Sequence, residues 1–532
     1  MSLIQAILIS LIYFLASSTL IGVGFFTLCK PMVSGFFVGL ILGNPVLGTQ
    51  IGASVNLMYM GSLSTGGSLS SDSTLACIVA TSLGIVGGQP IEASMAVAVP
   101  LGLLGTMLWF GRLGLSTMFV PLADRYAREG KASKFWIVNV LIPQGFLFLI
   151  SAVPVFIIIY FGTEFIQGIL NFLGANVLGA LIIIGGMLPA LGLGLTLKTI
   201  FQGQAKVYFF IGFLLIQYFG LNTISMAFIA LIIAILYMYG QNKDGEPISL
   251  SFSSAGDTPP TSGLITKRDL IQSCINWGFH AQACYNYERM QGIGFCHAMV
   301  PIFKKLYKEG SPEMAEAMQR HTGFFNTAPQ FAAMIPGLIA AMEEKRFQGA
   351  TDIDEGALTA VKTSLMGPLS GIGDTVCQGI LVPLLLTFFI GMAMDGNILG
   401  PILYFIIITV IVVAMCYFSY MLGYRKGSEA ILALLESGLI NKIIDAAKVM
   451  GCVVIGALVA SFVTVNTGIV LSVNQTSFNL QTQLFDVIVP GLLPLILTLG
   501  CYKLTDKGVS STKIMLILVA IGVIGGLTGI LV

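Results

Sequence analysis

The chain has 532 residues, of which 56% are hydrophobic and only 10% are charged, and its formal net charge is +1. Soluble domains carry about 25% charged residues, so this chain cannot cover a water-facing surface and lipid must be its main solvent. A net charge so close to zero gives no reason to expect a nucleic-acid partner. The composition therefore predicts an all-α polytopic membrane protein.

The first block, residues 1–240, contains one polar interruption between two apolar runs. Residues 61–72 read GSLSTGGSLSSD. Irregular backbone at membrane depth is tolerated only where protein or a water-filled cavity satisfies its N–H and C=O groups. We therefore expect a re-entrant hairpin that contains Gly66 and Gly67, ends at Asp72 and suits a ligand rich in hydroxyl groups. The alternative is close packing through small residues, with Asp72 only capping a helix.

Long apolar runs predict the membrane-spanning helices. A span needs about 20 residues, so the shorter runs should extend by a turn each way. The predicted spans are residues 137–161, 177–197 and 207–239 in the first block, the last long enough for two spans broken near residues 220–222, and residues 379–394, 398–417, 449–470, 487–502 and 514–532 in the second block.

Lysine and arginine alternate between successive loops. Arg125 and Arg128 lie in one basic loop and Arg425 and Lys426 in another, whereas residues 472–485 contain no basic residue. Cytoplasmic loops carry the excess of positive charge. The alternation therefore predicts that both termini lie outside and that the charged centre of the chain lies in the cytoplasm.

Residues 241–262 are rich in Ser, Pro, Gly and Asp and predict a flexible cytoplasmic linker between residues 1–240 and residues 263–532. The second block begins with an amphipathic and re-entrant part, residues 263–375, and continues with transmembrane helices in residues 376–532. Of the 51 charged residues, 21 lie in the central part of the chain, residues 267–374. There, Ser311-Pro312-Glu313 predicts a helix start, because the hydroxyl can cap, proline fits the first turn and the acid faces the positive helix end.

The second block contains two further interruptions. Residues 323–346 include only about a dozen successive apolar residues, too few to cross a bilayer, which indicates a re-entrant segment. Residues 363–375, TSLMGPLSGIGDT, contain the hairpin glycines Gly371 and Gly373 and end with Asp374 and a threonine. Interrupted segments in both halves of a transporter point to a binding site between the halves, although Asp374 could instead cap a helix.

The nine cysteines form no CxxC pair and show no metal-type spacing with the three histidines. Most of the cysteines lie in apolar runs, where small buried side chains are expected. The sequence therefore predicts no metal site and no cofactor.

Three stretches resemble the IID subunit of the mannose/fructose/sorbose family of the phosphoenolpyruvate-dependent sugar phosphotransferase system: YNYERMQGIGFCHAMVP (285–301), RHTGFFNTAPQFAAMIPGLIAAMEE (320–344) and LMGPLSGIGDT (365–375). That resemblance runs from about residue 270 to the end of the chain. The stretch LGTQIGASVNLMYMGSLSTGGSLSSDSTLACIVAT (47–81) resembles the IIC subunit of the same family, over about residues 1–240. The two subunits, normally separate chains, are here joined by residues 241–262.

The resemblance implies a sugar permease in the bacterial cytoplasmic membrane, with a core domain that moves against a scaffold domain in an elevator-like manner. It also implies a homotrimer, with a hexose or related sugar that a IIB subunit, itself charged by IIA, phosphorylates on the cytoplasmic side. Phosphoryl carriers of the family use histidine. Since His280, His297 and His321 all lie in IID-like sequence, we expect the chain by itself not to be an enzyme.

The resemblance further implies a set of sugar-binding residues. Tyr285 stands where the family usually has tryptophan, and Asn56 stands where relatives often have an acid or glutamine. Glu288 and Arg289 could instead form a plain ion pair, and Asn326 could cap a helix. The implied residues are Gln5, Asn56 and Asp72 in the first block, and Asn286, Glu288, Arg289, Gln291, Asn326 and Thr327 in the second; Asp374 joins them from the interruption described above.

Two other functions fit the same sequence. An ion-coupled secondary transporter with fused inverted halves would use Asp72 and Asp374 as ion carriers, and would deliver free sugar. A membrane receptor or scaffold would transport nothing. Group translocation differs from both because it delivers sugar phosphate and requires phosphoenolpyruvate.

Overall fold

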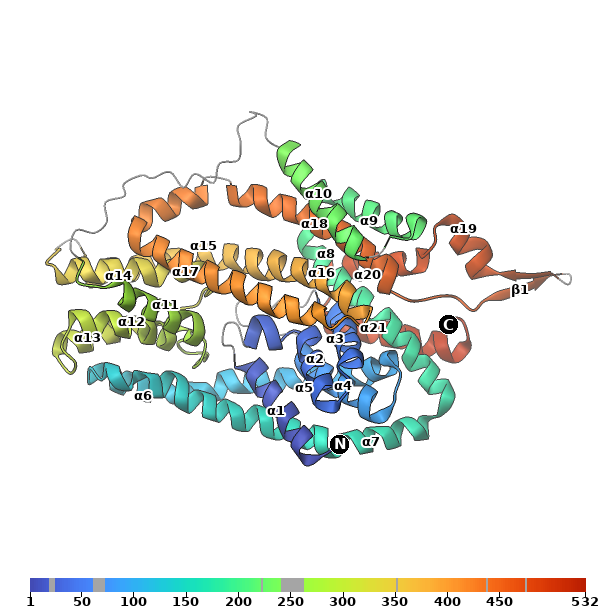
Figure 1. Ribbon diagram of the computed structural model, residues 1–532, viewed down its shortest axis with the longest axis horizontal. Helices are drawn as coiled ribbons and strands as arrows, with labels where there is room; N and C mark the ends of the chain where they lie inside the picture. Colours follow the sequence, from blue (N-terminus) through green and yellow to red (C-terminus); the bar gives the residue numbers. More distant parts are fainter. Residues whose placement is uncertain are drawn as a thin grey trace.

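The computed structural model describes the whole chain except residues 19–23, 61–71, 222, 241–262, 351–352, 437–438 and 474–475. Its regular structure is almost entirely helical, so the prediction of an all-α polytopic membrane protein is confirmed (Figure 1). The linker and the first glycine-rich stretch, with Gly66 and Gly67, lie outside the described residues.

The first block contributes helices α1 to α10. Short 3-10 or π-helical turns, Gly24–Leu28, Ser116–Phe119, Ala132–Lys134 and Ile137–Leu141, lie between some of them. The α-helices are α1 (Leu3–Ser17), α2 (Pro31–Leu42), α3 (Pro45–Tyr59), α4 (Ser73–Gly87), α5 (Ile91–Leu115), α6 (Val120–Arg128), α7 (Ile142–Met187), α8 (Pro189–Ile200), α9 (Ala205–Phe219) and α10 (Thr223–Gly240).

The second block contributes helices α11 to α21 and one hairpin of strands β1 (Val470–Val473) and β2 (Thr476–Asn479). Short turns of other helix types are Phe331–Ala333, Thr375–Leu381 and Gln481–Phe485. The α-helices are α11 (Lys267–His280), α12 (Gly292–Leu306), α13 (Pro312–His321), α14 (Met334–Phe347), α15 (Glu355–Asp374), α16 (Val382–Met394), α17 (Leu399–Glu436), α18 (Leu439–Phe462), α19 (Asp486–Ile488), α20 (Leu492–Asp506) and α21 (Ser511–Thr528).

Within the described residues, five helices are long and apolar enough to cross a membrane, or six if a pair of segments bent by 62° counts as one span. They agree with most of the predicted spans. Residues 207–239 form two helices, as expected, because Gly220 ends α9 in the left-handed conformation at φ 62°. The candidate spans are Ala132–Gly162, Gly179–Lys198, Glu355–Met394, Leu399–Lys426, Ile444–Phe462 and the bent pair Gln481–Ile488 with Leu492–Asp506.

One predicted interruption is wrong. Residues 363–375 form no hairpin, because α15 continues through the π-helical turn Thr375–Leu381 into α16 as one helix of 40 residues. The first two predicted spans agree with candidate spans, although α7 continues from the first into the second as one helix of 46 residues. Glycine and proline are tolerated in membrane helices where neighbours satisfy the freed backbone groups. The π-helical turn before Pro383 is wider than an α-helical turn and accommodates the proline ring.

Helices α2 and α3 pack with their backbones nearly in contact. Gly35 and Gly39 of α2 face Gly48 and Gly52 of α3, and a Cβ on Gly35 would lie only 2.6 Å from the carbonyl oxygen of Gly48. Small residues four apart allow this approach between membrane helices. The first block thereby gains a rigid helix pair next to α4, the helix that Asp72 caps.

The two blocks are interleaved. Helix α18 packs on α9 and α10, α20 packs on α8, α21 on α7 and α16 on α3. A second apolar core lies at one end of the long axis, where α6 of the first block joins α11 to α14, while β1 lies at the opposite end (Figure 1). Trp277 is fully buried there, and its indole N–H donates to the carbonyl of Pro329 at 2.7 Å. This core positions the loops that carry several predicted site residues.

The predicted start of α13 is confirmed. The Ser311 hydroxyl accepts a hydrogen bond from the Met314 N–H, and Pro312 is the first helical residue. Met314, Met318 and His321 are buried on one face, as the periodicity indicates. Helix α14 is not among the candidate spans, which agrees with its short apolar run.

Candidate functional site

A polar cavity lies where the two blocks meet, and its unfilled space of about 490 Å³ includes open solvent. Four side-chain amides and one carboxylate share it with four aromatic rings. The first block supplies Phe25, Phe26 and Trp109, and the second supplies Gln282, Tyr285, Asn326, Thr327, Pro329, Gln330, Ser370, Asp374 and Gln378. Amides and a carboxylate bond hydroxyl groups, and rings cover apolar faces, so the chemistry of this lining matches that of a polyhydroxylated solute.

One wall of the cavity is a helix face. Ser370, Asp374 and Gln378 recur at intervals of four residues along the end of α15 and the π turn that follows. The Gln378 amide donates to Asp374 Oδ1 at 2.9 Å. The structure thus places Asp374 in the cavity, where the predicted hairpin would have put it, although the backbone is helical.

The two glycines of this helix differ in their surroundings. A Cβ on Gly373 would lie 2.5 Å from the Cβ of Ala328 and 3.0 Å from that of Phe331, whereas one on Gly371 would meet no atom within 4 Å. Gly373 therefore lets α15 approach the loop that carries Asn326 and Thr327. Gly371 is exposed.

The loop with Asn326 and Thr327 lines the cavity next to α15. The Tyr285 hydroxyl donates to Asn326 Oδ1 at 3.0 Å, so Tyr285 both lines the cavity and orients an amide. Asn326 does not cap α14, which begins without a side-chain cap. The Thr327 hydroxyl donates to the Met366 carbonyl at 3.4 Å.

Gln291 lies behind this loop and not in the cavity wall. Its Oε1 accepts from the Thr327 N–H at 3.1 Å and its Nε2 donates to the Thr327 carbonyl at 2.8 Å. The side chain is only 1% exposed. Gln291 therefore acts as a frame for the loop, since an amide used twice on one residue's backbone fixes that residue's orientation.

The stretch before Gln291 is also structural in this conformation. Asn286 is buried, and its Oδ1 accepts from the N–H groups of Glu288 and Arg289 at 3.1 and 2.9 Å. Arg289 pairs with Glu288 at 3.4 Å and with Asp124 of α6 at 3.2 Å. The ion-pair interpretation of Glu288 and Arg289 matches these contacts, which join α6 of the first block to the second block.

The three predicted residues of the first block do not line the cavity. Gln5 forms a capping box with Ser2 and donates to the Ile41 carbonyl at 3.1 Å. Asn56 is buried and accepts from the Met32 N–H at 3.3 Å. Gln5 and Asn56 therefore connect elements of the first block through hydrogen bonds.

Asp72 caps helix α4 with one carboxylate oxygen and binds α1 with the other. Oδ1 accepts from the Leu75 N–H at 2.9 Å, and Oδ2 accepts from the Tyr13 hydroxyl at 2.5 Å. Its own N–H donates to the Gly102 carbonyl of α5 at 2.9 Å. Asp72 thus joins α1, α4 and α5, and the capping alternative describes it in this conformation.

Arg112 links the two blocks beside the cavity. Its guanidinium donates to the Ser17 carbonyl at 2.7 Å and to the Gln282 carbonyl at 3.2 Å, and lies 5.5 Å from the ring centroid of Trp109. Gln282 and Trp109 both line the cavity. Sequence reasoning missed Arg112, because only the fold brings α5 next to the loop after α11.

The histidines belong to the second core. His321 is 1% exposed and shares Glu343 with Arg320, at 2.8 and 2.9 Å respectively. Burial lowers the pKa of His321 to about 4, and burial together with repulsion from His280 lowers the pKa of His297 to about 3. His297 and His321 are therefore neutral near pH 7 and enclosed by protein in this conformation.

Apolar spans together with a polar cavity between the two blocks are features of a membrane protein that binds a small polar solute. Comparison with known proteins names the solute class. Residues 264–531 match the family model of the PTS system mannose/fructose/sorbose family IID component, and residues 3–236 match that of the PTS system sorbose-specific iic component. The chain belongs to the mannose/fructose/sorbose family of the phosphotransferase system, and it is a fused IIC–IID sugar permease.

Individual relatives agree with this assignment. The mannose-specific EIID component of Escherichia coli K12 is 38% identical over 281 residues, which cover 51% of this chain and 98% of that protein. The sorbose-specific EIID component of Klebsiella pneumoniae is 37% identical, with 50% and 98% covered. The mannose-specific EIIC component of E. coli K12 is 28% identical over 230 residues, with 43% and 86% covered. IIC and IID components work with IIA and IIB components of the same system.

Two solved structures share 36% sequence identity with this chain. One, described as the structure of a membrane protein, covers 50% of this chain and 98% of its own, with a TM-score of 0.46. The other, a cryoEM structure of the mannose transporter ManYZ in complex with microcin E492, covers 51% and 99%, with a TM-score of 0.30.

Proposed function

We propose that the chain translocates a hexose or related sugar by group translocation, and that the sugar binds in the cavity between the blocks. The observation that carries this proposal is the cavity itself, in which Asp374 and Asn326 of the second block share a wall with Trp109 of the first. A carboxylate inside a membrane protein is costly and marks a functional site by default. Hydroxyl groups of a sugar would bond Asp374 and the amides, while the Trp109 ring would cover a C–H face.

Phosphorylation is assigned to separate subunits. The enclosed positions of His297 and His321 support this assignment, because a phosphoryl carrier must present its imidazole to a partner protein. In the proposed cycle, IIA charges IIB, and IIB phosphorylates the sugar when the cavity opens to the cytoplasm. The fused chain supplies the path and the binding site in a homotrimer.

The proposed motion is an elevator-like movement of a core against a scaffold. Helices α1, α4 and α5, which Asp72 joins, are assigned to the moving part. Gln5, Asn56 and Asp72 contact the sugar only after this part has moved, since Tyr13 occupies one Asp72 oxygen in the present conformation. Asn286, Glu288, Arg289 and Gln291 frame the site from the other block.

The proposed topology places the linker, residues 241–262, in the cytoplasm and the C-terminus outside, in the bacterial cytoplasmic membrane. The concentration of basic residues in alternate loops supports this orientation. Protease added to inside-out vesicles should cut the linker and leave two membrane-embedded parts that remain associated. Cutting only from the outer face would reverse the assignment.

Transport in proteoliposomes tests the proposal and separates the alternatives. With phosphoenolpyruvate, IIA, IIB and their phosphocarrier enclosed, labelled sugar should accumulate as sugar phosphate, and an ionophore should not prevent this. Accumulation of free sugar that collapses with the ion gradient would indicate a secondary transporter. Sugar binding without uptake would indicate a receptor or scaffold.

A further inference from the structure

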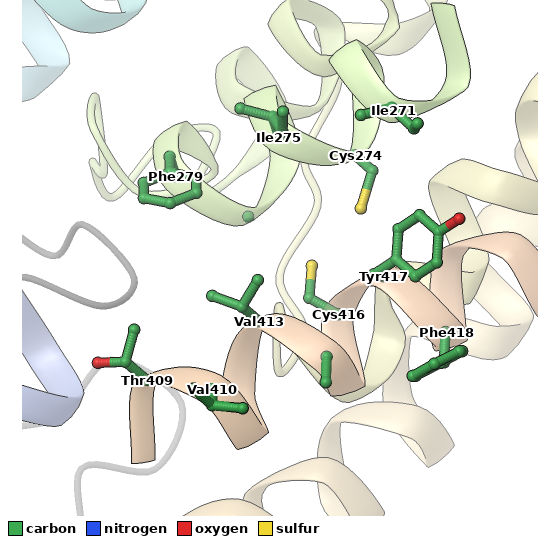
Figure 2. Close-up of a pocket in the computed structure, with 12 residues that line it drawn as sticks. Ile271, Cys274, Ile275, Phe279, Thr409, Val410, Val413, Cys416, Tyr417 and Phe418 are labelled. Atoms are coloured by element: carbon green, nitrogen blue, oxygen red, sulfur yellow. The ribbon is translucent and has the colours of Figure 1, made fainter. Parts of the chain in front are cut away.

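An open apolar groove lies between α11 and α17, on the side of the second block (Figure 2). Its unfilled space of about 1160 Å³ includes open solvent. Ile275 and Phe279 of α11 face Val410 and Val413 of α17 across it, and no charged residue lines it. The sulfur atoms of Cys274 and Cys416 point toward each other between the helices (Figure 2).

The groove opens onto a surface that meets lipid. Helix α17 contains the candidate span Leu399–Lys426, of which only 33% of the most apolar window is buried in protein. Val410 and Phe418, at the groove, are 62% and 69% exposed. In a bilayer, hydrocarbon chains cover an apolar surface of this kind, because the transfer of apolar surface from water to hydrocarbon is favourable.

Three hydrogen bonds fix how α11 lies along α17. The Tyr420 hydroxyl donates to Ser273 Oγ at 2.6 Å. Glu344 then joins the two ends, because its Oε1 accepts from the Ile265 N–H at 3.0 Å and its Oε2 accepts from the Tyr424 hydroxyl at 2.6 Å. The first turn of α11 therefore lies beside the last turn of the α17 span.

This register brings basic residues from both helices to one end of the groove. Lys267 and Arg268 begin α11, two and three residues beyond Ile265, and Arg425 and Lys426 directly follow Tyr424. Lys267, Arg268 and Arg425 are exposed. Basic side chains at the end of an apolar path between helices match the phosphate and acyl chain of one anionic lipid.

We propose that this groove binds an anionic phospholipid. One acyl chain lies between α11 and α17, and the phosphate group bonds the basic cluster formed by Lys267, Arg268, Arg425 and Lys426. The proposed topology puts this cluster at the cytoplasmic face, where anionic lipids are attracted to basic side chains. The lipid would hold α11, and with it the loop that carries Gln282 and Tyr285, against the span α17.

The test uses the full chain purified from nanodiscs that contain equal amounts of phosphatidylglycerol and phosphatidylcholine. Native mass spectrometry then measures the retained lipid. The wild-type chain should retain phosphatidylglycerol preferentially, and Val413→Trp, which fills the groove, should remove this retention. Arg268→Gln and Arg425→Gln should each weaken retention of phosphatidylglycerol by about fivefold and reduce the preference over phosphatidylcholine.

Two control variants keep the result interpretable. Ile406→Trp introduces the same side chain at a half-exposed site of α17 that does not line the groove, and Lys308→Gln removes an exposed charge near the far end of α12. Both should retain lipid as the wild-type chain does. A loss of retention in these controls that equals the loss in Val413→Trp would overturn the proposed site.

Other occupants give different results. Equal retention of the two lipids, unchanged by Arg268→Gln and Arg425→Gln, would show a hydrocarbon groove without a headgroup site and would overturn the proposal. Unchanged phosphatidylglycerol retention in Val413→Trp would place the lipid elsewhere. A fall in oligomer mass in Val413→Trp without a change in retained lipid would show that a second copy of the chain covers the groove.

Discussion

Replacing Asp374 by asparagine tests the proposed sugar site most directly. Asp374 lines the cavity from the end of α15 and accepts a hydrogen bond from the Gln378 amide at 2.9 Å. Asparagine keeps the size of the side chain and an oxygen that can accept from Gln378. The change therefore removes charge with little change in packing.

The size of the effect follows from the bonds that a sugar would make. Hydrogen bonds to a charged group contribute about 1.5–3 kcal/mol, against about 0.5–1.5 kcal/mol for neutral pairs. One sugar hydroxyl bonded to the Asp374 carboxylate is enough to give the effect. The variant should lose about 1–2 kcal/mol of binding free energy, which raises the dissociation constant about 5- to 30-fold.

Titration calorimetry of the purified chain in nanodiscs measures this constant, with the transported sugar identified first from uptake. Asp395→Asn is a matched control, because Asp395 is exposed at the end of α16 and lies outside the cavity. The control should bind sugar as the wild-type chain does. Both variants should have melting temperatures close to that of the wild type.

Two results would refute the reasoning. If Asp374→Asn binds sugar with unchanged affinity but melts at a lower temperature, then Asp374 serves only to hold Gln378 and the π turn. If Asp374→Asn and Asp395→Asn weaken binding equally, the effect comes from net charge and not from the cavity.

Three further predictions concern the frame around the cavity. Gln291→Leu should lower the free energy of unfolding by about 2–4 kcal/mol in chemical denaturation, because both backbone groups of Thr327 lose their partner, and an unchanged midpoint would contradict the framing role. Gly373→Val should destabilise the fold by about 1–3 kcal/mol through overpacking against Ala328. Gly371→Val should leave the melting temperature and sugar binding unchanged, and it should stop uptake if α15 slides during transport. Normal uptake by Gly371→Val would argue against such sliding. The pKa of His297 is about 3 in the fold against about 6.5 in the unfolded chain. The neutral imidazole therefore costs no stability above pH 6.5, and the free energy of unfolding falls toward pH 3 by up to about 1.4 kcal/mol per pH unit. His297→Leu should flatten this dependence in melting curves, and an unaltered slope would refute it.

Much of the fold could be predicted from the sequence because lipid imposes a simple rule. A run of about 20 apolar residues must be helical and must cross, which located most spans, and Gly220 marked the break between α9 and α10. The same rule misled at residues 363–375. Glycine and proline end helices in water, but in a membrane protein α15 continues past Pro368 into a π turn.

The candidate site was predicted only in part. Asn326, Thr327 and Asp374 do line one cavity, and the four-residue spacing of Ser370, Asp374 and Gln378 was a signal that the expected hairpin concealed. Trp109 and Gln282 gave no local signal, because they reach the cavity through packing between distant segments.

The contrast between Gln291 and Asn326 shows that an amide in a sequence motif can hold the loop of a site in shape as readily as it can line the cavity. A sugar must enter and leave, so the side chains that touch it need only weak, exchangeable bonds. The loop that presents them must keep its shape without the sugar, which requires bonds that stay made: the two from Gln291 to Thr327 are buried and use both ends of one amide. Polar residues that look like ligands in the sequence can therefore be fully occupied inside the protein, while Asn326, oriented by Tyr285, faces the cavity.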